Sequence, residues 1–259
     1  MKILACVKQI PDMASKFKPN AAGNWYSEDD LAFRLNEYDE YAVEEAVKLR
    51  EQGAATEAVA LSIGPARAAE ALKKALAMGC DRAVHVQDDE AHLKDPWQIA
   101  SLLAAWVRKE NFELVFTGMQ SQDRGSGQVG PLLAEMLGWP CVTTVIDFRL
   151  DGGAVTAKRE LEGGAKGVVK TRLPAVITCQ LGLNTPRYPT LPNIMQARKK
   201  PIDVVRAHDL SPESALSVTE EFRAPEKKGN ALLLEGGDPA WLAGRLLDIL
   251  KEKTTVLKD

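Results

Sequence analysis

Short apolar runs alternate with longer amphipathic segments along the first 140 residues of the chain. Residues 2–7, 57–63, 83–86 and 113–117 are apolar runs of strand length. The segments between them carry apolar residues at helical spacing, as in RLNEYDEYAVEEAVKLREQG. This alternation predicts a parallel sheet with helices on both faces, whose ligands bind outside the carboxyl ends of the strands.

The predicted helices carry recognisable start and stop signals. Asn36 is placed to cap the first helix, with Asp39 three residues on, and Gly53 ends it. Pro65 lies in the first turn of the second helix, which ends at Gly79. The third helix is PWQIASLLAAWVRKEN and the fourth is LLAEMLG. The residues of the third helix that we expect to face inward are Ile99, Leu102, Leu103 and Trp106.

The pattern changes after Pro140. Residues 143–150, 154–160, 167–172 and 175–179 resemble short strands joined by glycine-rich turns, which predicts an antiparallel addition to the sheet. From about residue 203 the chain is mostly polar, until the amphipathic helix DPAWLAGRLLDILKEK. That helix needs a surface to cover, either on its own domain or on another chain. Its apolar side carries Trp241, Leu242, Leu246, Leu247 and Leu250.

Composition narrows the class of protein. A chain of 259 residues fits one large α/β domain, or one domain with a sizeable extension. Its net charge of −3 gives no general attraction to nucleic acid or to an anionic membrane. No apolar run is long enough to cross a bilayer, and the opening MKILACVKQIPD does not resemble a signal peptide. We therefore expect a cytoplasmic protein with no nucleic-acid partner and no direct membrane insertion.

Metal and nucleophile chemistry has no local signature in the sequence. The four cysteines are not in CxxC spacing, and the three histidines form no HExxH pattern. No GxSxG elbow is present. We expect no metal site, and each cysteine is predicted to act as a small hydrophobic residue.

The loop that follows the fourth predicted strand is the best candidate for binding a ligand. It reads GMQSQDRGSGQVGP, and three of its glycines lie just before or at the start of a helix. Backbone N–H groups at such a place can face a phosphate, and the helix dipole favours the anion. Ser126 and Gln128 add side-chain donors, while Arg124 supplies positive charge or points to solvent. A tight turn with helix capping remains the alternative.

Three further segments are predicted to reach the same edge of the sheet. They are residues 6–8 after the first strand, residues 36–39 at a helix start and residues 63–65 after the second strand. Backbone groups of Cys6 and Ile63 could contact the edge of an adenine ring. Asn36 taken alone could be a simple helix cap. The convergence of the segments indicates a nucleotide site more strongly than any one residue does.

The stretch RYPTLPNIMQARKKP, residues 187–201, has a different character. Its three prolines predict an irregular segment, and Leu191, Ile194 and Met195 lie between them. Arg198, Lys199 and Lys200 follow directly. A loop packed on its own sheet with a solvated basic run would explain it, and so would a docking segment with an apolar tip.

Several motifs occur in the order in which one known family has them. They are LACVKQIPD, NEYDEYAVEEAVKL, LSIGPARAAEALKKALAMGCDRAVHV, GMQSQDRGSGQVGP and RLPAVITCQLGLNTPRYPTLPNIMQARKKP. Over residues 1–205 the chain resembles the beta subunit of electron-transfer flavoprotein. The resemblance implies a Rossmann-like domain over residues 1–205 that typically buries AMP. It also implies an alpha subunit that holds FAD, and a C-terminal arm, residues 206–259, that reaches onto that partner.

The resemblance also implies roles for particular residues. It places Leu191, Pro192, Ile194, Met195, Lys199 and Lys200 in a recognition loop for acyl-CoA or related dehydrogenases, whose electrons pass toward a membrane quinone oxidoreductase. The chain would then be an electron-carrier subunit with no chemistry of its own. The nucleotide contacts that it implies, together with neighbouring positions, are Cys6, Asn36, Tyr38, Asp39, Ile63, Asp123, Gly125, Ser126, Gly127, Gln128, Val129 and Gly130.

Two other interpretations stay open. Some members of the family hold a second FAD in place of AMP and use it to react with NADH and bifurcate electrons. A protein of the wider adenine-nucleotide α/β class could instead sense a nucleotide without a redox role. The recognition loop is an argument against the sensor, which has no need of one.

Overall fold

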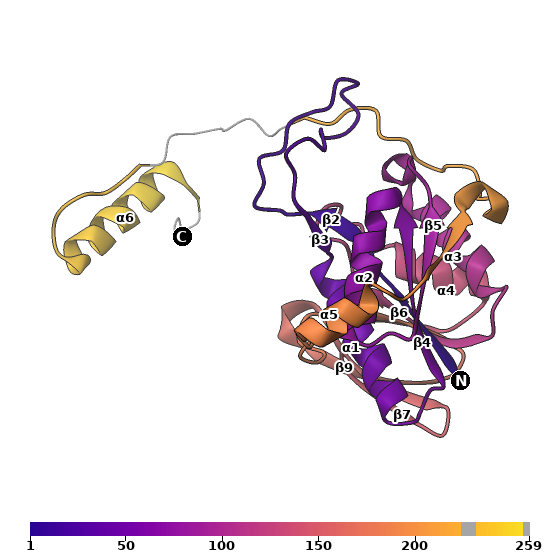
Figure 1. Cartoon of the computed structure of the whole chain (residues 1–259). Helices are drawn as coiled ribbons and strands as arrows, with labels where there is room; N and C mark the ends of the chain where they lie inside the picture. The colour runs from indigo at the N-terminus through magenta and orange to yellow at the C-terminus, as the bar shows by residue number, and fades with distance from the viewer. Residues whose placement is uncertain (224–231, 256–259) are drawn as a thin grey trace. The chain divides into compact units, whose positions relative to one another are not determined.

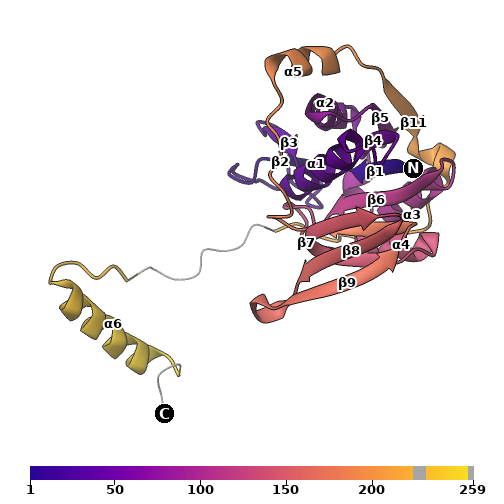
Figure 2. The same ribbon diagram turned by 90° about the horizontal axis from the view of Figure 1, so that it is seen from below.

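A central sheet with helices on both faces forms the body of the protein. The computed structural model describes residues 1–223 and 232–255, which fall into two units, Met1–Arg223 and Ala224–Asp259. The sheet of the first unit has the strand order β11-β5-β4-β1-β6-β10-β7-β8-β9 among the described residues. The predicted α/β class is confirmed, and Figures 1 and 2 show the layers from two sides.

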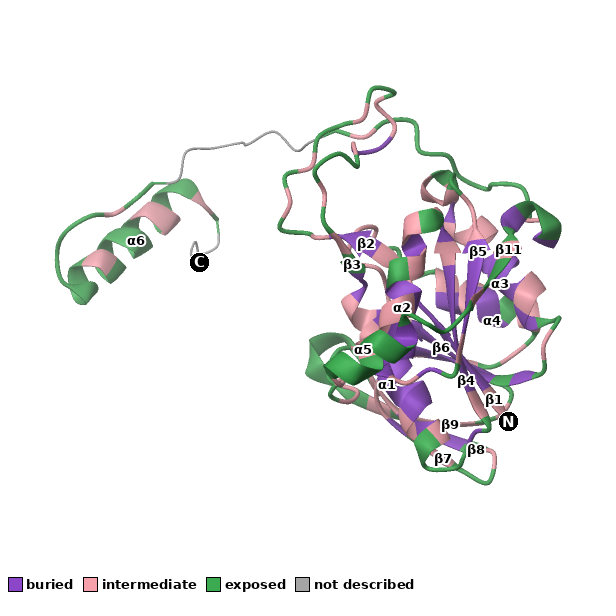
Figure 3. Cartoon of the chain, viewed as in Figure 1, coloured by how far each residue is buried: buried purple, intermediate pink, exposed green. Residues whose placement is uncertain are grey.

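The predicted parallel half of the sheet is present. β1 (Lys2–Cys6) lies between β4 (Glu57–Gly64) and β6 (Phe112–Gly118), and β5 (Arg82–Gln87) follows β4, all in parallel. Side chains of β1 alternate between two cores because successive strand residues point to opposite faces. Ile3 and Ala5 enter one core, and Leu4 and Cys6 enter the other. Figure 3 shows these strands buried at the centre of the unit.

Two helices cover each face of this part of the sheet. α1 (Glu37–Glu51) and α2 (Ala69–Met78) pack on one face, and α2 follows the short 3-10 helix η1 (Ala66–Ala68). α3 (Pro96–Val107) and α4 (Val129–Leu137) pack on the other. A further 3-10 helix, η2 (Ala91–Leu93), precedes α3. The small antiparallel pair β2 (Gln9–Pro11) and β3 (Phe33–Leu35) brackets a long loop after β1.

The second half of the sheet differs in part from the prediction. β7 (Cys141–Asp151), β8 (Ala154–Glu160) and β9 (Lys166–Arg172) are antiparallel neighbours, as expected, and η3 (Glu162–Gly164) lies between β8 and β9. β10 (Ala175–Cys179) is not part of that addition, because it inserts between β6 and β7 and is parallel to both. All five of its residues are buried, which is typical of a central parallel strand.

Two elements near residue 200 were not predicted. Residues 191–197 form a short helix, α5 (Leu191–Ala197), where an irregular segment was expected. Thr190 accepts a hydrogen bond from the Asn193 N–H at its start, and proline is tolerated in a first helical turn. β11 (Ile202–Arg206) then adds to the edge of the sheet in parallel with β5, and η4 (Ala207–Leu210) follows it.

Residues 211–223, which we call the strap, follow η4 and run across the unit to contact the loop that precedes β3 (Figure 1). Asp95 Oδ2 accepts hydrogen bonds from the backbone N–H groups of Leu216 at 2.7 Å and Ser217 at 2.9 Å. Farther along, the Phe222 N–H donates to the Gly23 carbonyl at 2.8 Å. The strap therefore belongs to the first unit, which runs past residue 205 to Arg223.

The second unit contains one described helix, α6 (Pro239–Lys253), as predicted from its amphipathic pattern. Asp238 caps it by accepting from the Trp241 N–H at 2.8 Å. None of the residues of α6 is buried, and Trp241 is 54% exposed. Among the described residues, no helix combines the length and apolar character needed to cross a membrane.

Candidate functional site

The order of the strands creates a switch point beside β1. From β1 the chain proceeds through β4 to β5 on one side, and then returns to form β6 on the other side of β1. The loops that leave the carboxyl ends of β1 and β6 therefore diverge, and they leave a crevice of the kind that binds ligands in open α/β sheets. A cavity of about 180 Å³ lies there, lined from the ends of these strands, from α3 and from the residues before α4.

Asp39, in the first turn of α1, ties the two diverging strands together. Its Oδ2 accepts from the Lys8 N–H at 2.7 Å, just after β1, and its Oδ1 accepts from the Gly118 N–H at 3.1 Å, at the end of β6. Gly118 is required there because a Cβ atom would lie 2.2 Å from Asp39 Oδ1. Burial raises the pKa of Asp39 to about 7, although these hydrogen bonds oppose the shift.

Asn36 does not cap α1 with its side chain, so that prediction was wrong in its mechanism. Asn36 occupies the N-cap position, but its side chain makes no capping hydrogen bond. Instead, Nδ2 donates to the Gln120 carbonyl at 2.9 Å, and Oδ1 accepts from the Gln122 N–H at 3.1 Å. The side chain thus holds the loop that follows β6. These distant hydrogen bonds replace the local capping bond.

Lys8 and Asp123 form an ion pair beside the cavity. Lys8 Nζ lies 2.6 Å from Asp123 Oδ2 and 3.3 Å from Ser121 Oγ. Burial lowers the pKa of Lys8, and the carboxylate of Asp123 opposes that shift. The pair anchors the ligand loop to the end of β1, and it leaves the charge of Lys8 compensated.

Arg124 is the cation of the cavity whose charge no carboxylate balances among residues 1–223 and 232–255. Lys94 is 2.8 Å from Asp88, and Arg67 pairs with Glu28. The guanidinium of Arg124 lies 4.6 Å from the ring centroid of Trp25 and donates to backbone carbonyls, including that of Lys94 at 3.2 Å. Arg124 therefore lines the cavity, which resolves the choice between positive charge at the site and solvent exposure.

The start of α4 has the features of an anion site. Gln128, at its N-cap, makes no side-chain capping bond, so the first N–H groups are not occupied by that side chain. Gly125 and Gly127 both have φ of 62°, a left-handed conformation that bends the loop. A Cβ on Gly130 would lie 2.5 Å from Thr178 Cγ2, so glycine lets α4 approach the sheet closely. The arrangement suits a phosphate at the helix N-terminus.

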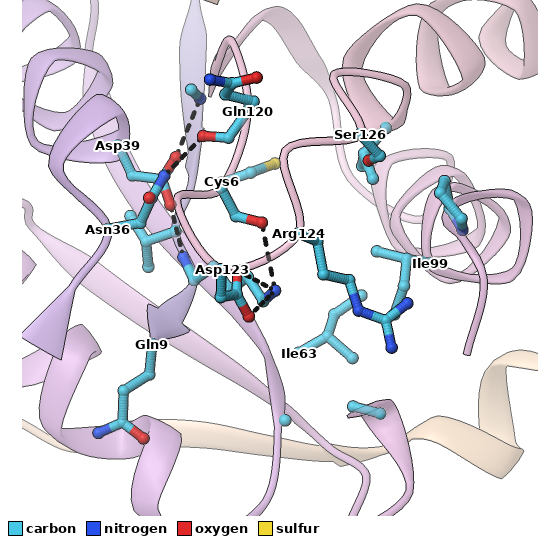
Figure 4. Close-up of a pocket in the computed structure, with 18 of the residues that line it drawn as sticks. Cys6, Gln9, Asn36, Asp39, Ile63, Ile99, Gln120, Asp123, Arg124 and Ser126 are labelled. Atoms are coloured by element: carbon cyan, nitrogen blue, oxygen red, sulfur yellow. Dashed lines mark hydrogen bonds and ion pairs between the residues drawn. The ribbon is translucent and has the colours of Figure 1, made fainter. Parts of the chain in front are cut away.

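Most of the predicted site residues meet in one place. Figure 4 shows Asn36 and Asp39 on one side of the cavity and Ile99 and Ser126 on the other. Tyr38 and Gly125 are not among the described lining residues. The Tyr38 hydroxyl accepts from Gln120 Nε2 at 3.3 Å. The predicted residues that line the cavity are Cys6, Asn36, Asp39, Ile63, Asp123, Ser126, Gly127, Gln128, Val129 and Gly130.

Sequence reasoning missed a second group of lining residues. Gln9, Trp25, Arg67, His92 and Ile99 come from five different segments and also line the cavity. Ile99 had been assigned only to the inward face of a helix. Trp25 stands in a polar loop, and a single tryptophan among polar residues was the only signal that could have drawn attention to it.

The candidate docking segment lies apart from the cavity residues, on α5. Leu191 is 70% exposed and Met195 is 56% exposed, whereas Ile194 packs against the core. Arg187 anchors the chain before this helix by pairing with Glu44 at 2.9 Å and Glu51 at 2.7 Å, both on α1.

The basic run after α5 is divided between a structural contact and exposed charge. Lys200 Nζ donates to the Cys80 carbonyl at 3.0 Å, so this side chain is partly tied to the body of the unit. Arg198 and Lys199 are exposed. The segment therefore presents an apolar tip, Leu191 and Met195, beside two exposed positive charges.

Comparison with known proteins identifies the family of the chain. The model of the electron transfer flavoprotein domain matches residues 24–210. A Bacillus subtilis protein named electron transfer flavoprotein subunit beta is 39% identical over 89% of this chain and 90% of its own length. The mitochondrial subunit beta of Oryza sativa subsp. indica is 40% identical over 99% of this chain and 100% of its own. The Homo sapiens subunit beta is 38% identical over 88% and 90%, respectively.

The buried carboxylate of Asp39 predicts a specific dependence of stability on pH. Its pKa is about 7 in the folded chain, well above the ordinary value of an aspartate side chain, because the carboxyl group is buried. A raised folded pKa favours folding at low pH, and this contribution is lost as the pH rises through 7. In Asp39→Asn that loss is absent. Urea unfolding should therefore show the free energy of unfolding of the variant, relative to wild type, increasing by about 1 kcal/mol or more from pH 5 to pH 8.

Glu40→Gln is the matched control. Glu40 lies in the same helix turn, and its carboxylate pairs only with Lys74 among the described residues. The free energy of unfolding of Glu40→Gln, relative to wild type, should not increase in this way from pH 5 to pH 8. A constant difference between Asp39→Asn and wild type across this range would mean that Asp39 titrates with an ordinary pKa.

Proposed function

The chain belongs to the electron transfer flavoprotein family as a beta subunit, and from this premise we propose that it is the AMP-binding half of a cytoplasmic electron carrier. It would pair with an alpha subunit that holds FAD. Acyl-CoA or related dehydrogenases would dock through the Leu191 segment and deliver electrons to that flavin. The flavin would supply the redox chemistry and pass electrons toward a membrane quinone oxidoreductase.

The nucleotide proposal rests mainly on the cavity at the switch point. It combines the N-terminus of α4, a cation without a carboxylate partner in the described chain, and the carboxyl ends of β1 and β4, which line the cavity. Phosphate suits the first two features, and an adenine edge suits backbone groups near Cys6 and Ile63. These residues fit a nucleotide.

The charge of the site favours AMP over a second FAD. Lys8, Arg67 and Lys94 are already paired with carboxylates, which leaves Arg124 to balance a ligand charge. A single phosphate matches the one lining cation that no carboxylate of the described chain pairs with, together with one helix N-terminus.

The docking proposal rests on two features of α5: its apolar residues Leu191 and Met195 are exposed, and the chain just before the helix is held in place by ion pairs. A small apolar tip can fill a pocket on a partner, and it loses little conformational entropy when the helix is already held in place. Arg187 supplies that hold through Glu44 and Glu51. Arg198 and Lys199 would speed encounter with acidic dehydrogenases in a salt-sensitive way.

The arm proposal rests on α6. Trp241 is 54% exposed, and Leu246 and Leu247 are 50% and 49% exposed, which leaves an apolar side on a charged helix. An apolar surface of this kind marks an interaction site. We place it against the alpha subunit.

The nucleotide content of the purified heterodimer tests the proposed function directly. The chain would be co-expressed with its alpha subunit, denatured, and its released AMP and FAD quantified by chromatography. We expect one AMP and one FAD per heterodimer. Two FAD and no AMP would instead identify a bifurcating subunit. Purification of the chain without any flavin-bearing partner would favour the nucleotide sensor.

Leu191→Ala should weaken electron transfer from the dehydrogenase without changing flavin content. Removal of an apolar anchor that the docked partner would bury is expected to lower kcat/KM for transfer about tenfold, equivalent to about 1.4 kcal/mol. Val204→Ala is the control, because Val204 is a similarly exposed aliphatic residue, at 59%, on the edge strand β11. Unchanged transfer kinetics in Leu191→Ala would remove the docking role.

Deletion of residues 236–259 should weaken the heterodimer. The deleted segment contains α6, whose apolar side chains would otherwise be covered by the alpha subunit. Co-purification at decreasing protein concentration measures the effect, with Asp248→Asn as a control that leaves the apolar side intact. Equal retention of the alpha subunit by the deleted and full-length chains would refute the arm assignment.

A further inference from the structure

The loop between β2 and β3, residues 12–32, forms one wall of the switch-point cavity, and we call it the lid. Trp25 and Tyr26 of the lid line the cavity and are 9% and 7% exposed. Neither residue belongs to the two core clusters that the described residues form. The Asn20 N–H donates to the Trp25 carbonyl at 2.7 Å, so the lid is held together from within. The lid is therefore a folded piece that lies outside both cores.

Contacts of three kinds hold the lid against the rest of the first unit. Inside the cavity, the guanidinium of Arg124 lies 4.6 Å from the ring centroid of Trp25. At the surface, Glu28 pairs with Arg67 of η1, and these side chains are 41% and 29% exposed. An ion pair that is so exposed contributes little to stability. The strap makes the third contact.

One end of the strap is fixed to α3. Asp95, the N-cap of this helix, accepts hydrogen bonds at Oδ2 from the Leu216 N–H at 2.7 Å and the Ser217 N–H at 2.9 Å. The helix packs in a core cluster, and it lines the cavity through Ile99 and Leu103. The strap is thus attached to a wall of the cavity that cannot move without disrupting the core.

The other end of the strap is fixed to the lid. The Phe222 N–H donates to the Gly23 carbonyl at 2.8 Å. The centroid of the Phe222 ring lies 6.3 Å from that of Trp25 and 6.2 Å from that of Tyr26, within the range of favourable aromatic pairs. Figure 1 shows the strap running to the indigo loop that forms the lid. The strap therefore joins the lid to the wall formed by α3.

The strap packs weakly on the unit. Of residues 213–223, Phe222 is the one that is not exposed. The aliphatic side chains of Leu216 and Val218 are 74% and 77% exposed, so they add little packing. Segments with few buried apolar contacts open at a small cost in free energy, without unfolding of the core. The strap can therefore detach while α3 and the sheet stay folded.

We propose that the strap is a clasp that controls nucleotide exchange: it holds the lid closed over the switch-point cavity, and nucleotide enters and leaves when Phe222 detaches from the lid. The inference rests on the proposed function and adds a conformational step to it. Because α3 is part of a core and the lid is not, the lid is the wall that moves. A nucleotide that touches Trp25 and Tyr26 stabilises the closed lid, and the clasp limits how often the lid opens.

The rate of nucleotide exchange tests the clasp. Phe222→Ala removes the ring that contacts the lid, and Val218→Ala, which shortens an exposed strap residue, is the matched control. Neither residue is among the described lining residues, so neither change touches the nucleotide directly. The heterodimer with its bound AMP would be mixed with excess isotopically labelled AMP, and replacement followed by mass spectrometry. Phe222→Ala should exchange about tenfold faster than wild type, and Val218→Ala at the wild-type rate.

The association rate separates an opened clasp from a damaged site. The heterodimer would be freed of nucleotide by dialysis in mild denaturant, and its uptake of labelled AMP timed by rapid mixing and filtration. In Phe222→Ala both association and release should be faster, so the dissociation constant changes less than the release rate. Asp95→Asn is a second variant: it keeps one oxygen for the α3 cap and loses the other as an acceptor for the strap. It should change both rates in the same direction.

Hydrogen exchange in the wild-type heterodimer tests the clasp without a substitution. The amides of Leu216, Ser217 and Phe222 donate the hydrogen bonds that fix the strap at its two ends. Because bound nucleotide stabilises the closed lid, these amides should exchange more slowly with AMP than without it. Amides of β9, an edge strand of the antiparallel addition, should exchange at the same rate in both states.

Wild-type rates of exchange in Phe222→Ala and Asp95→Asn, with strap amides that do not respond to AMP, would overturn the clasp and leave the proposed nucleotide site standing. Faster release without faster association in these variants would also overturn it, because a damaged site explains that result. Circular dichroism would establish that each variant is folded, and hydrogen exchange decides the matter should Phe222→Ala not fold. Wild type that holds and takes up neither AMP nor FAD would refute the proposed function itself, and the clasp with it.

Discussion

The carboxylate of Asp39 is the contact on which the site depends. It bridges the Lys8 N–H after β1 and the Gly118 N–H at the end of β6, at the point where two neighbouring parallel strands send their loops in opposite directions. Diverging loops at a switch point leave a crevice, and the backbone donors at its edge need acceptors. Here one helix side chain accepts from two such donors, so the crevice has a defined shape before any ligand enters.

The same helix also holds the base of the segment that we propose for docking. Asn36 and Asp39, at the start of α1, hold the loops around the cavity, and Glu44 and Glu51 farther along hold Arg187. A helix has a fixed rise of about 1.5 Å per residue, so the spacing between these two sets of contacts is rigid. α1 therefore serves as a common frame for the candidate nucleotide site and for the base of the docking segment.

The far wall of the cavity is built without regular secondary structure. Phe222 of the strap packs on Trp25 and Tyr26, while Asp95 accepts two backbone hydrogen bonds from Leu216 and Ser217. Although burial penalises its charge, these bonds and the helix cap hold the pKa of Asp95 below its usual value. The strap thus fixes the loop that carries Trp25, and it does so just before the first unit ends at Arg223.

Local patterns account for the alternation of strands and helices, because period-2 and helical spacing of apolar residues can be recognised within single segments. They also predict that Cys6, Ile63 and the loop before α4 meet, since the carboxyl ends of parallel strands share one edge. Features without a local signature depend on the folded chain. The insertion of β10 between β6 and β7 depends on long-range pairing. Asn36 could bond the start of its own helix or a distant loop, and the folded chain shows that it bonds Gln120 and Gln122. Trp25 reaches the cavity because three separate segments pack around it, and no pattern within one segment encodes such a meeting.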